Sequence, residues 1–191
     1  MRRTALLAVL VLAACGYHLT GTGTTVPEGA RTIRIELFTN HTRETGLEVH
    51  LHSALEDEFR RQGTLRVVTD GDADLVLSGN IRSFSSVPVA FSANDEAVQY
   101  QGIMRVGMRL TERQSGHVLF ENKLLQESQD FGAVSGVVVT SSPHFQRGTI
   151  DARDLSNLTN VQIGETRRRE AQRELIDLLA HDIYLQTMEG F

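Results

Sequence analysis

The sequence has no tryptophan, three prolines and one cysteine, Cys15, among 191 residues. Since a disulfide needs two cysteines, the fold must be held by its hydrophobic core even in an oxidising compartment. A surplus of basic residues is also missing, because 19 Lys and Arg stand against 24 Asp and Glu, for a formal net charge of −5. This balance argues against nucleic acid as the main partner, since nucleic-acid-binding proteins usually carry a basic surplus.

The single cysteine follows a stretch with the features of a secretory signal. Arg2 and Arg3 precede the apolar residues 5–14, a run that is too short to span a bilayer as a helix. A general signal peptidase prefers small residues at both −3 and −1, but the bulky Leu12 occupies −3 relative to Cys15. The sequence Leu-Ala-Ala-Cys instead resembles the lipobox of bacterial lipoproteins. The alternative is that Cys15 is a buried apolar residue of a first helix or strand.

The lipobox resemblance implies a processing route and a location. In bacterial lipoproteins the cysteine sulfur receives a diacylglycerol, the chain is cut just before it, and the new amino terminus is acylated, for example with palmitate. We therefore expect residues 1–14 to be a removed signal peptide and Cys15 to carry lipid, which is the only group that we expect to be attached. Two or more acyl chains anchor durably, at about 0.8 kcal/mol per buried CH₂. Gly16 is not acidic, which implies the periplasmic leaflet of the outer membrane as the destination.

The remaining chain divides into a tether and one domain. Residues 15–31 are rich in Gly and Thr and include Pro27, which is typical of an extended tether. Residues 32–191 are enough for a single domain with a substantial core.

Hydrophobic periodicity predicts the elements of that domain. Thr45 and Glu48 stand at capping-box spacing and predict the start of a helix that ends before Gly63. A second amphipathic helix is predicted over 166–188, with Ala171, Leu175, Leu178, Leu179 and Ile183 facing inward. Alternating patterns predict strands at 32–37, 65–69, 75–84 (with 87–91 as an extension), 98–111 and 118–129.

This order of elements predicts the fold class. We expect an α+β fold with a mostly antiparallel four- to five-stranded sheet and two helices packed on one face. Between residues 131 and 164 the pattern fades, although 132–140 has the composition of one more strand. A connection this long is usually functional or disordered, so we expect a long irregular segment there.

No motif predicts an active site. His50 and His52 form an H-x-H pair, but residues two apart on a helix point in divergent directions. Asp70, Asp72 and Asp74 resemble the start of a calcium loop, but the glycine and glutamate that such a loop needs do not follow. The chain also lacks a G-x-S-x-G elbow. We therefore expect a protein that is not an enzyme and holds no metal.

Three basic side chains are candidates for binding. Arg105 and Arg109 fall on one face of a predicted strand, about 13 Å apart at about 3.3 Å per residue, and Lys123 falls on the next strand. Such a row can contact anionic phosphates. The alternative is a solvated outer face that is neutralised by Glu112 and Glu121.

The opening after the lipobox cysteine, CGYHLTG at 15–21, resembles that of LptE, a family of lipopolysaccharide-assembly lipoproteins. The resemblance covers nearly all of the chain after Cys15 except 131–164, a segment that is longer than the family usually carries. The other segments that resemble the family are TIRI at 32–35, FTNHT at 38–42, GLE at 46–48, ADLVLSG at 73–79 and SGHVLFEN at 115–122.

The resemblance implies a non-catalytic partner of the outer-membrane β-barrel LptD. Members of the family sit in the barrel lumen as a plug, help the barrel to assemble and contact lipopolysaccharide, for which Arg105, Arg109 and Lys123 are the candidate residues. The alternative is a periplasmic adaptor lipoprotein that activates a cell-wall synthase. The compact opening with almost no linker favours LptE, because an activator must reach across the periplasm.

Overall fold

The computed structural model describes residues 25–69, 71–93, 95, 97–132 and 152–190, with side chains described outside 152–164. Cys15, the predicted signal peptide and most of the predicted tether lie outside the described residues. The elements are β1 (Thr32–Ile35), β2 (Thr39–Asn40), α2 (Leu47–Gln62), β3 (Arg66–Val67), β4 (Leu75–Phe91), β5 (Ala97–Glu112), β6 (Val118–Gly132) and α3 (Ala152–Glu189).

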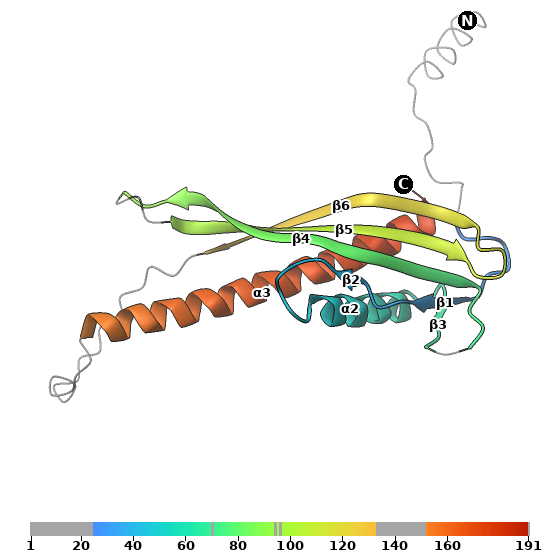
Figure 1. The fold of residues 1–191 in the computed structure, drawn as a ribbon, viewed down its shortest axis with the longest axis horizontal. Helices are drawn as coiled ribbons and strands as arrows, with labels where there is room; N and C mark the ends of the chain where they lie inside the picture. The colour runs from blue at the N-terminus through green and yellow to red at the C-terminus, as the bar shows by residue number, and fades with distance from the viewer. Residues whose placement is uncertain (1–24, 70, 94, 96, 133–151, 191) are drawn as a thin grey trace, which may run out of the picture.

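The strands form one mixed sheet of six strands in the order β3-β1-β4-β5-β6, with β2 also paired to β4 (Figure 1). The long strands β4, β5 and β6 form an antiparallel meander, whereas β1 is parallel to both β3 and β4, and β2 is parallel to β4. The α+β class is confirmed, but the predicted four to five mostly antiparallel strands are wrong. Helix α2 carries the chain over from β1 to β3, which makes that pair parallel. Strand β2 has two residues and is too short to show alternation.

Both helices cover the same face of the sheet (Figure 1). Leu51, Leu55 and Phe59 of α2 are fully buried, as are Leu175 and Leu179 of α3. The rings of Phe59 and Tyr184 meet edge to face with centroids 5.0 Å apart, which joins the two helices. Leu178 is 43% exposed, so its predicted inward position is wrong.

The start of α2 differs from the predicted capping box. Gly46 is the N-cap residue, in the left-handed conformation at φ 87°, and no side chain caps the helix. The Glu48 carboxylate instead accepts a 2.6 Å hydrogen bond from the Asn40 amide, which ties the helix to β2. The end is as predicted, since Gly63 at φ 68° donates its N–H to the Phe59 carbonyl oxygen.

Helix α3 begins at Ala152 rather than at Thr166. The second part of the predicted irregular segment 131–164 is therefore helical, whereas residues 133–151 lie outside the described part. Residues 152–164 carry many Ser, Asn and Thr and no continuous apolar stripe, so periodicity does not reveal this helix. None of the described helices has the length and apolar character needed to cross a membrane.

The last residues of the predicted tether lie on the domain. Thr25 donates its N–H to the Met188 carbonyl oxygen at 3.2 Å, beside the end of α3. The Asp74 carboxylate accepts hydrogen bonds from the backbone N–H groups of Arg31 and Thr32, at 2.8 and 2.9 Å. Asp74 therefore joins the chain before β1 to the start of β4.

Candidate functional site

The sheet face away from the helices is lined mainly by polar side chains. Cross-strand neighbours point to the same face. In this way Ser78, Arg109 and Glu121 form one row across β4, β5 and β6. Ser83, Arg105 and Gln126 form another row, beyond the pair of Asn80 and Gly107. Further along lies a third row, Val87, Gln101 and Asp130, in which the Gln101 amide donates to Asp130 at 3.1 Å.

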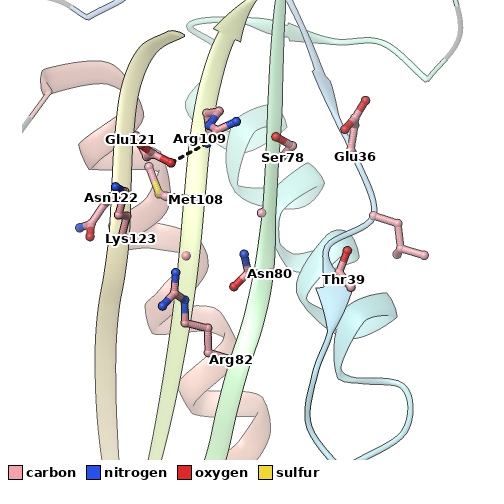
Figure 2. A pocket seen from close by; sticks show the side chains of 13 residues that line it. Glu36, Thr39, Ser78, Asn80, Arg82, Met108, Arg109, Glu121, Asn122 and Lys123 are labelled. Carbon is pink, nitrogen blue, oxygen red and sulfur yellow. Dashed lines mark hydrogen bonds and ion pairs between the residues drawn. The ribbon is translucent and has the colours of Figure 1, made fainter.

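A pocket of about 290 Å³, here called the outer-face pocket, opens on this face (Figure 2). The side chains that surround it come from β2, β4, β5, β6 and the connection between β1 and β2, and the helices lie behind the sheet in this view. The lining residues are Glu36, Leu37, Thr39, Ser78, Gly79, Asn80, Arg82, Gly107, Met108, Arg109, Glu121, Asn122 and Lys123.

Gly107 forms the floor of the outer-face pocket. A Cβ at this position would lie 3.2 to 3.3 Å from the Lys123 carbonyl oxygen, the Arg82 Nε and the Asn80 Oδ1. The β5–β6 register shifts at this point, between Val106 and Met108, which is the signature of a β-bulge. The hollow thus results from a missing side chain and a bulge on the neighbouring strand.

The charges around the pocket do not balance. Arg109 Nη2 lies 2.7 Å from Glu121 Oε1, and this hydrogen bond lowers the pKa of the Glu121 carboxyl from its usual value. Glu36 is paired with an arginine outside the pocket, Arg34, at 3.3 Å. Arg82 forms no ion pair within the described residues, and the same holds for Lys123. The pocket therefore has an excess of positive charge.

The structure brings together two of the three predicted binding residues. Arg109 and Lys123 line the pocket, whereas Arg105 lies on the same sheet face but outside the lining. Sequence reasoning missed Arg82. The signal was available, because Leu75 and Leu77 alternate inward along β4 and leave the polar side chains between and beyond them for the other face.

The histidines and aspartates that were considered as metal ligands are placed apart from one another or have other partners. His52 Nε2 lies 3.5 Å from Glu56, and His50 is exposed on α2. Asp72 pairs with Arg113, while Asp74 is engaged by the backbone; Asp70 lies outside the described residues. No group of three or more His, Cys, Asp or Glu suited to a metal ion occurs in the described part of the chain.

The chemistry of the outer-face pocket is that of binding. Guanidinium and ammonium groups bind phosphate and carboxylate anions through charge-assisted hydrogen bonds. The amide of Asn80 and the hydroxyls of Ser78 and Thr39 add neutral donors and acceptors. Together these groups suit a polar, anionic ligand on an open surface.

Comparison with known proteins gives the chain a family. Residues 30–187 match the family described as LptE, lipopolysaccharide assembly. No curated protein matches the sequence. Protein XCC0632 from Xanthomonas campestris has a similar structure, with a TM-score of 0.50 at 10% identity over 86% of this chain and 88% of its own. A minor lipoprotein from Acinetobacter baumannii gives a TM-score of 0.47 at 17% identity over 84% and 92% of the two chains.

Proposed function

The chain belongs to the LptE family of lipopolysaccharide-assembly proteins, and from this membership we propose that it is a non-catalytic plug of the LptD β-barrel. It helps the barrel to assemble and contacts lipopolysaccharide on its way to the outer leaflet. Acyl chains on Cys15 hold it to the periplasmic leaflet of the outer membrane, and the domain stands in the barrel lumen.

The observation that carries this proposal is the polar sheet face without helices. A barrel lumen is polar, so a plug needs a surface that forms hydrogen bonds and ion pairs. The rows across β4, β5 and β6 supply hydroxyl, amide and charged groups along the length of the sheet. The helices bury the opposite face, which leaves this one free for a partner.

The lipopolysaccharide contact is assigned to the outer-face pocket. Lipopolysaccharide carries anionic phosphate groups, and in the described part of the protein Arg82 and Lys123 form no salt bridge, although the charge of Lys123 acts on Glu121. Arg109 is already paired with Glu121, so its contribution to an added anion is smaller. Arg105 lies outside the lining and has a secondary role in this account.

Charge reversal tests the assignment. A hydrogen bond to a charged group contributes about 1.5–3 kcal/mol, and 1.4 kcal/mol is tenfold in affinity. We expect Arg82→Glu and Lys123→Glu each to weaken lipopolysaccharide binding about tenfold or more, with the full chain in detergent. The matched control is Arg173→Glu, an exposed arginine of α3, which should bind as the wild type does.

The three variants distinguish lipopolysaccharide binding at the pocket from an effect of the net charge of the protein. If Arg173→Glu weakens binding as much as the two pocket variants, the effect comes from net charge and the pocket assignment is wrong. If none of the three variants changes binding, lipopolysaccharide is held elsewhere. Neither result bears on the plug function, which is tested separately by affinity purification of the β-barrel partner.

A further inference from the structure

Strand β4 is paired along the whole of one edge but along only part of the other. On the side of β5 the pairing runs the full length of the strand. On the other side β1 and β2 pair only with residues 75–77 and 80–81. There the chain leaves the sheet after His41, which donates its N–H to the Ile81 carbonyl oxygen at 2.9 Å. Residues 82–91 thus form an edge with which no strand pairs in the described part of the chain, here called the free β4 edge.

The helices leave the free β4 edge open. Helix α3 packs mainly on β5, β6 and α2, and α2 packs beside β1, β2 and β3. Strands β4 and β5 continue beyond α2 as a long hairpin (Figure 1). Val87, Val89 and Phe91 in this part of β4 are 40%, 45% and 59% exposed. Unpaired backbone N–H and C=O groups beside exposed apolar side chains are a template for a further strand.

The free β4 edge differs in charge from β6, the edge strand on the other side of the hairpin. Proteins protect edge strands against pairing with charged side chains and bulges. Residues 83–91 have the sequence SFSSVPVAF, without a charged side chain. Strand β6 has a register shift near its middle. It also carries four charged side chains, Glu121, Lys123, Glu127 and Asp130. The protection that β6 has is therefore missing from the free β4 edge.

One stretch of the free β4 edge has regular strand geometry. From Ser83 to Pro88 the register with β5 is continuous, and the register shifts of β4 lie before and after this stretch. Pro88 has no N–H to donate and therefore ends a ladder of hydrogen bonds. Residues 83–87 remain, which is the length of a common strand of about five residues.

We propose that the free β4 edge pairs with the same edge of a second copy of this chain, antiparallel and about a two-fold axis at Ser85. In this register Ser83 faces Val87 of the second copy, and Phe84 faces Ser86. Such an interface uses the same residues on both chains and closes as a dimer. The inference does not depend on the proposed function.

The charges favour a second copy as the occupant. Like charges that face each other across two strands destabilise the pair. A stretch without charge can pair with itself and avoid this cost, and Arg82, the nearest charged residue of β4, would face the uncharged Pro88 of the second copy. A strand rich in one sign of charge would find no opposite charge within residues 83–91.

Sedimentation of the full chain in detergent, over a range of protein concentrations, tests the pairing. We expect the wild type to dimerise as its concentration rises. Val87→Lys places an ammonium group opposite Ser83 of the second copy, whose neighbour on β5 is Arg105. The substitution occurs twice in the symmetric pair and should weaken association about tenfold. The control is Val118→Lys on β6, since Val118 is 41% exposed and Val87 is 40% exposed, and it should associate as the wild type does.

A disulfide tests the position of the two-fold axis. Opposed residues of an antiparallel pair have Cα atoms about 4.5–5.5 Å apart, within the range of a disulfide. We expect Ser85→Cys to form a disulfide-linked dimer on mild oxidation. Ser128→Cys, an exposed serine of β6, should stay largely monomeric. Both variants also carry Cys15→Ser, so that the new cysteine is the only thiol.

Three results would overturn the proposal. The first is a wild type that stays monomeric at every concentration. The second is an equal effect of the matched changes, either Val87→Lys and Val118→Lys on association or Ser85→Cys and Ser128→Cys on cross-linking. The third is hydrogen exchange in which the amides of 83–87 are protected to the same degree at low and high concentration, because another segment of the same chain would then pair with the edge.

Discussion

Gly79 of β4 has no room for a side chain. A Cβ there would lie 2.4 Å from the Gly107 carbonyl oxygen and 2.4 Å from Cε2 of Phe38. Unstrained contacts between carbon atoms lie near 3.5–4.0 Å. Phe38 is only 2% exposed, and the Gly107 oxygen belongs to the backbone of the neighbouring strand, so neither atom moves away freely.

The structure gives the size of the effect of Gly79→Ala. Overpacking of this kind destabilises by about 1–3 kcal/mol. About 0.5–1 kcal/mol is recovered, because glycine is less favourable than alanine within a strand. We expect a net loss of about 1 kcal/mol, and at most about 2.5 kcal/mol, in the free energy of unfolding. A loss of about 1 kcal/mol corresponds to roughly 2–4 °C in the unfolding midpoint.

Urea unfolding of the full chain measures this loss. Gly132→Ala is the control, because nothing lies closer than 4.0 Å to a Cβ at the end of β6, and it should stay within about 0.5 kcal/mol of the wild type. Phe38→Leu combined with Gly79→Ala should lose less than the sum of the two single changes, since the ring and the new methyl compete for one space. If Gly79→Ala is as stable as Gly132→Ala, the packing argument is wrong.

Three further changes have defined outcomes. The backbone N–H of Arg31 and further hydrogen bonds from Thr32 lower the pKa of Asp74. The stability that Asp74 contributes is therefore present above its unfolded pKa of 3.8 and is lost as the pH falls through its folded pKa. Asp74→Asn should thus lose stability at pH 7 but show a smaller further drop at pH 3, as measured by denaturant midpoints. Arg168→Ala removes an ion pair to Glu44 and the stacking of the guanidinium 5.6 Å from the ring centroid of Phe84, so hydrogen exchange in residues 40–46 should accelerate. Cys15→Ser should leave an unacylated chain that membranes retain less well, and retention equal to the wild type would contradict the lipobox interpretation.

Much of the fold follows from local patterns in the sequence. The alternation of Leu75 and Leu77 places β4 and its buried face, and Gly63 marks the end of α2, because a left-handed residue stops a helix. Strand β2 and the parallel pairing of β1 depend on contacts between distant segments, which periodicity does not report. The early start of α3 at Ala152 has no apolar stripe to signal it.

The pocket could be predicted only in part. The positions of Arg109 and Lys123 on one sheet face follow from alternation along β5 and β6. The hollow itself depends on the register of two strands, because it lies where Gly107 meets the bulge in β6. Alternation along β4 places Arg82 on the same sheet face, but its position at the pocket depends on the register shift between Ile81 and Ser83, which alternation does not report.

The most direct test of the plug function is affinity purification from detergent-solubilised outer membranes, with a tag at the carboxy terminus of the full chain. We expect a large, heat-modifiable β-barrel to be recovered in stoichiometric amount with the tagged chain. Recovery of a cell-wall synthase without any barrel would contradict it and would favour an adaptor that activates that enzyme.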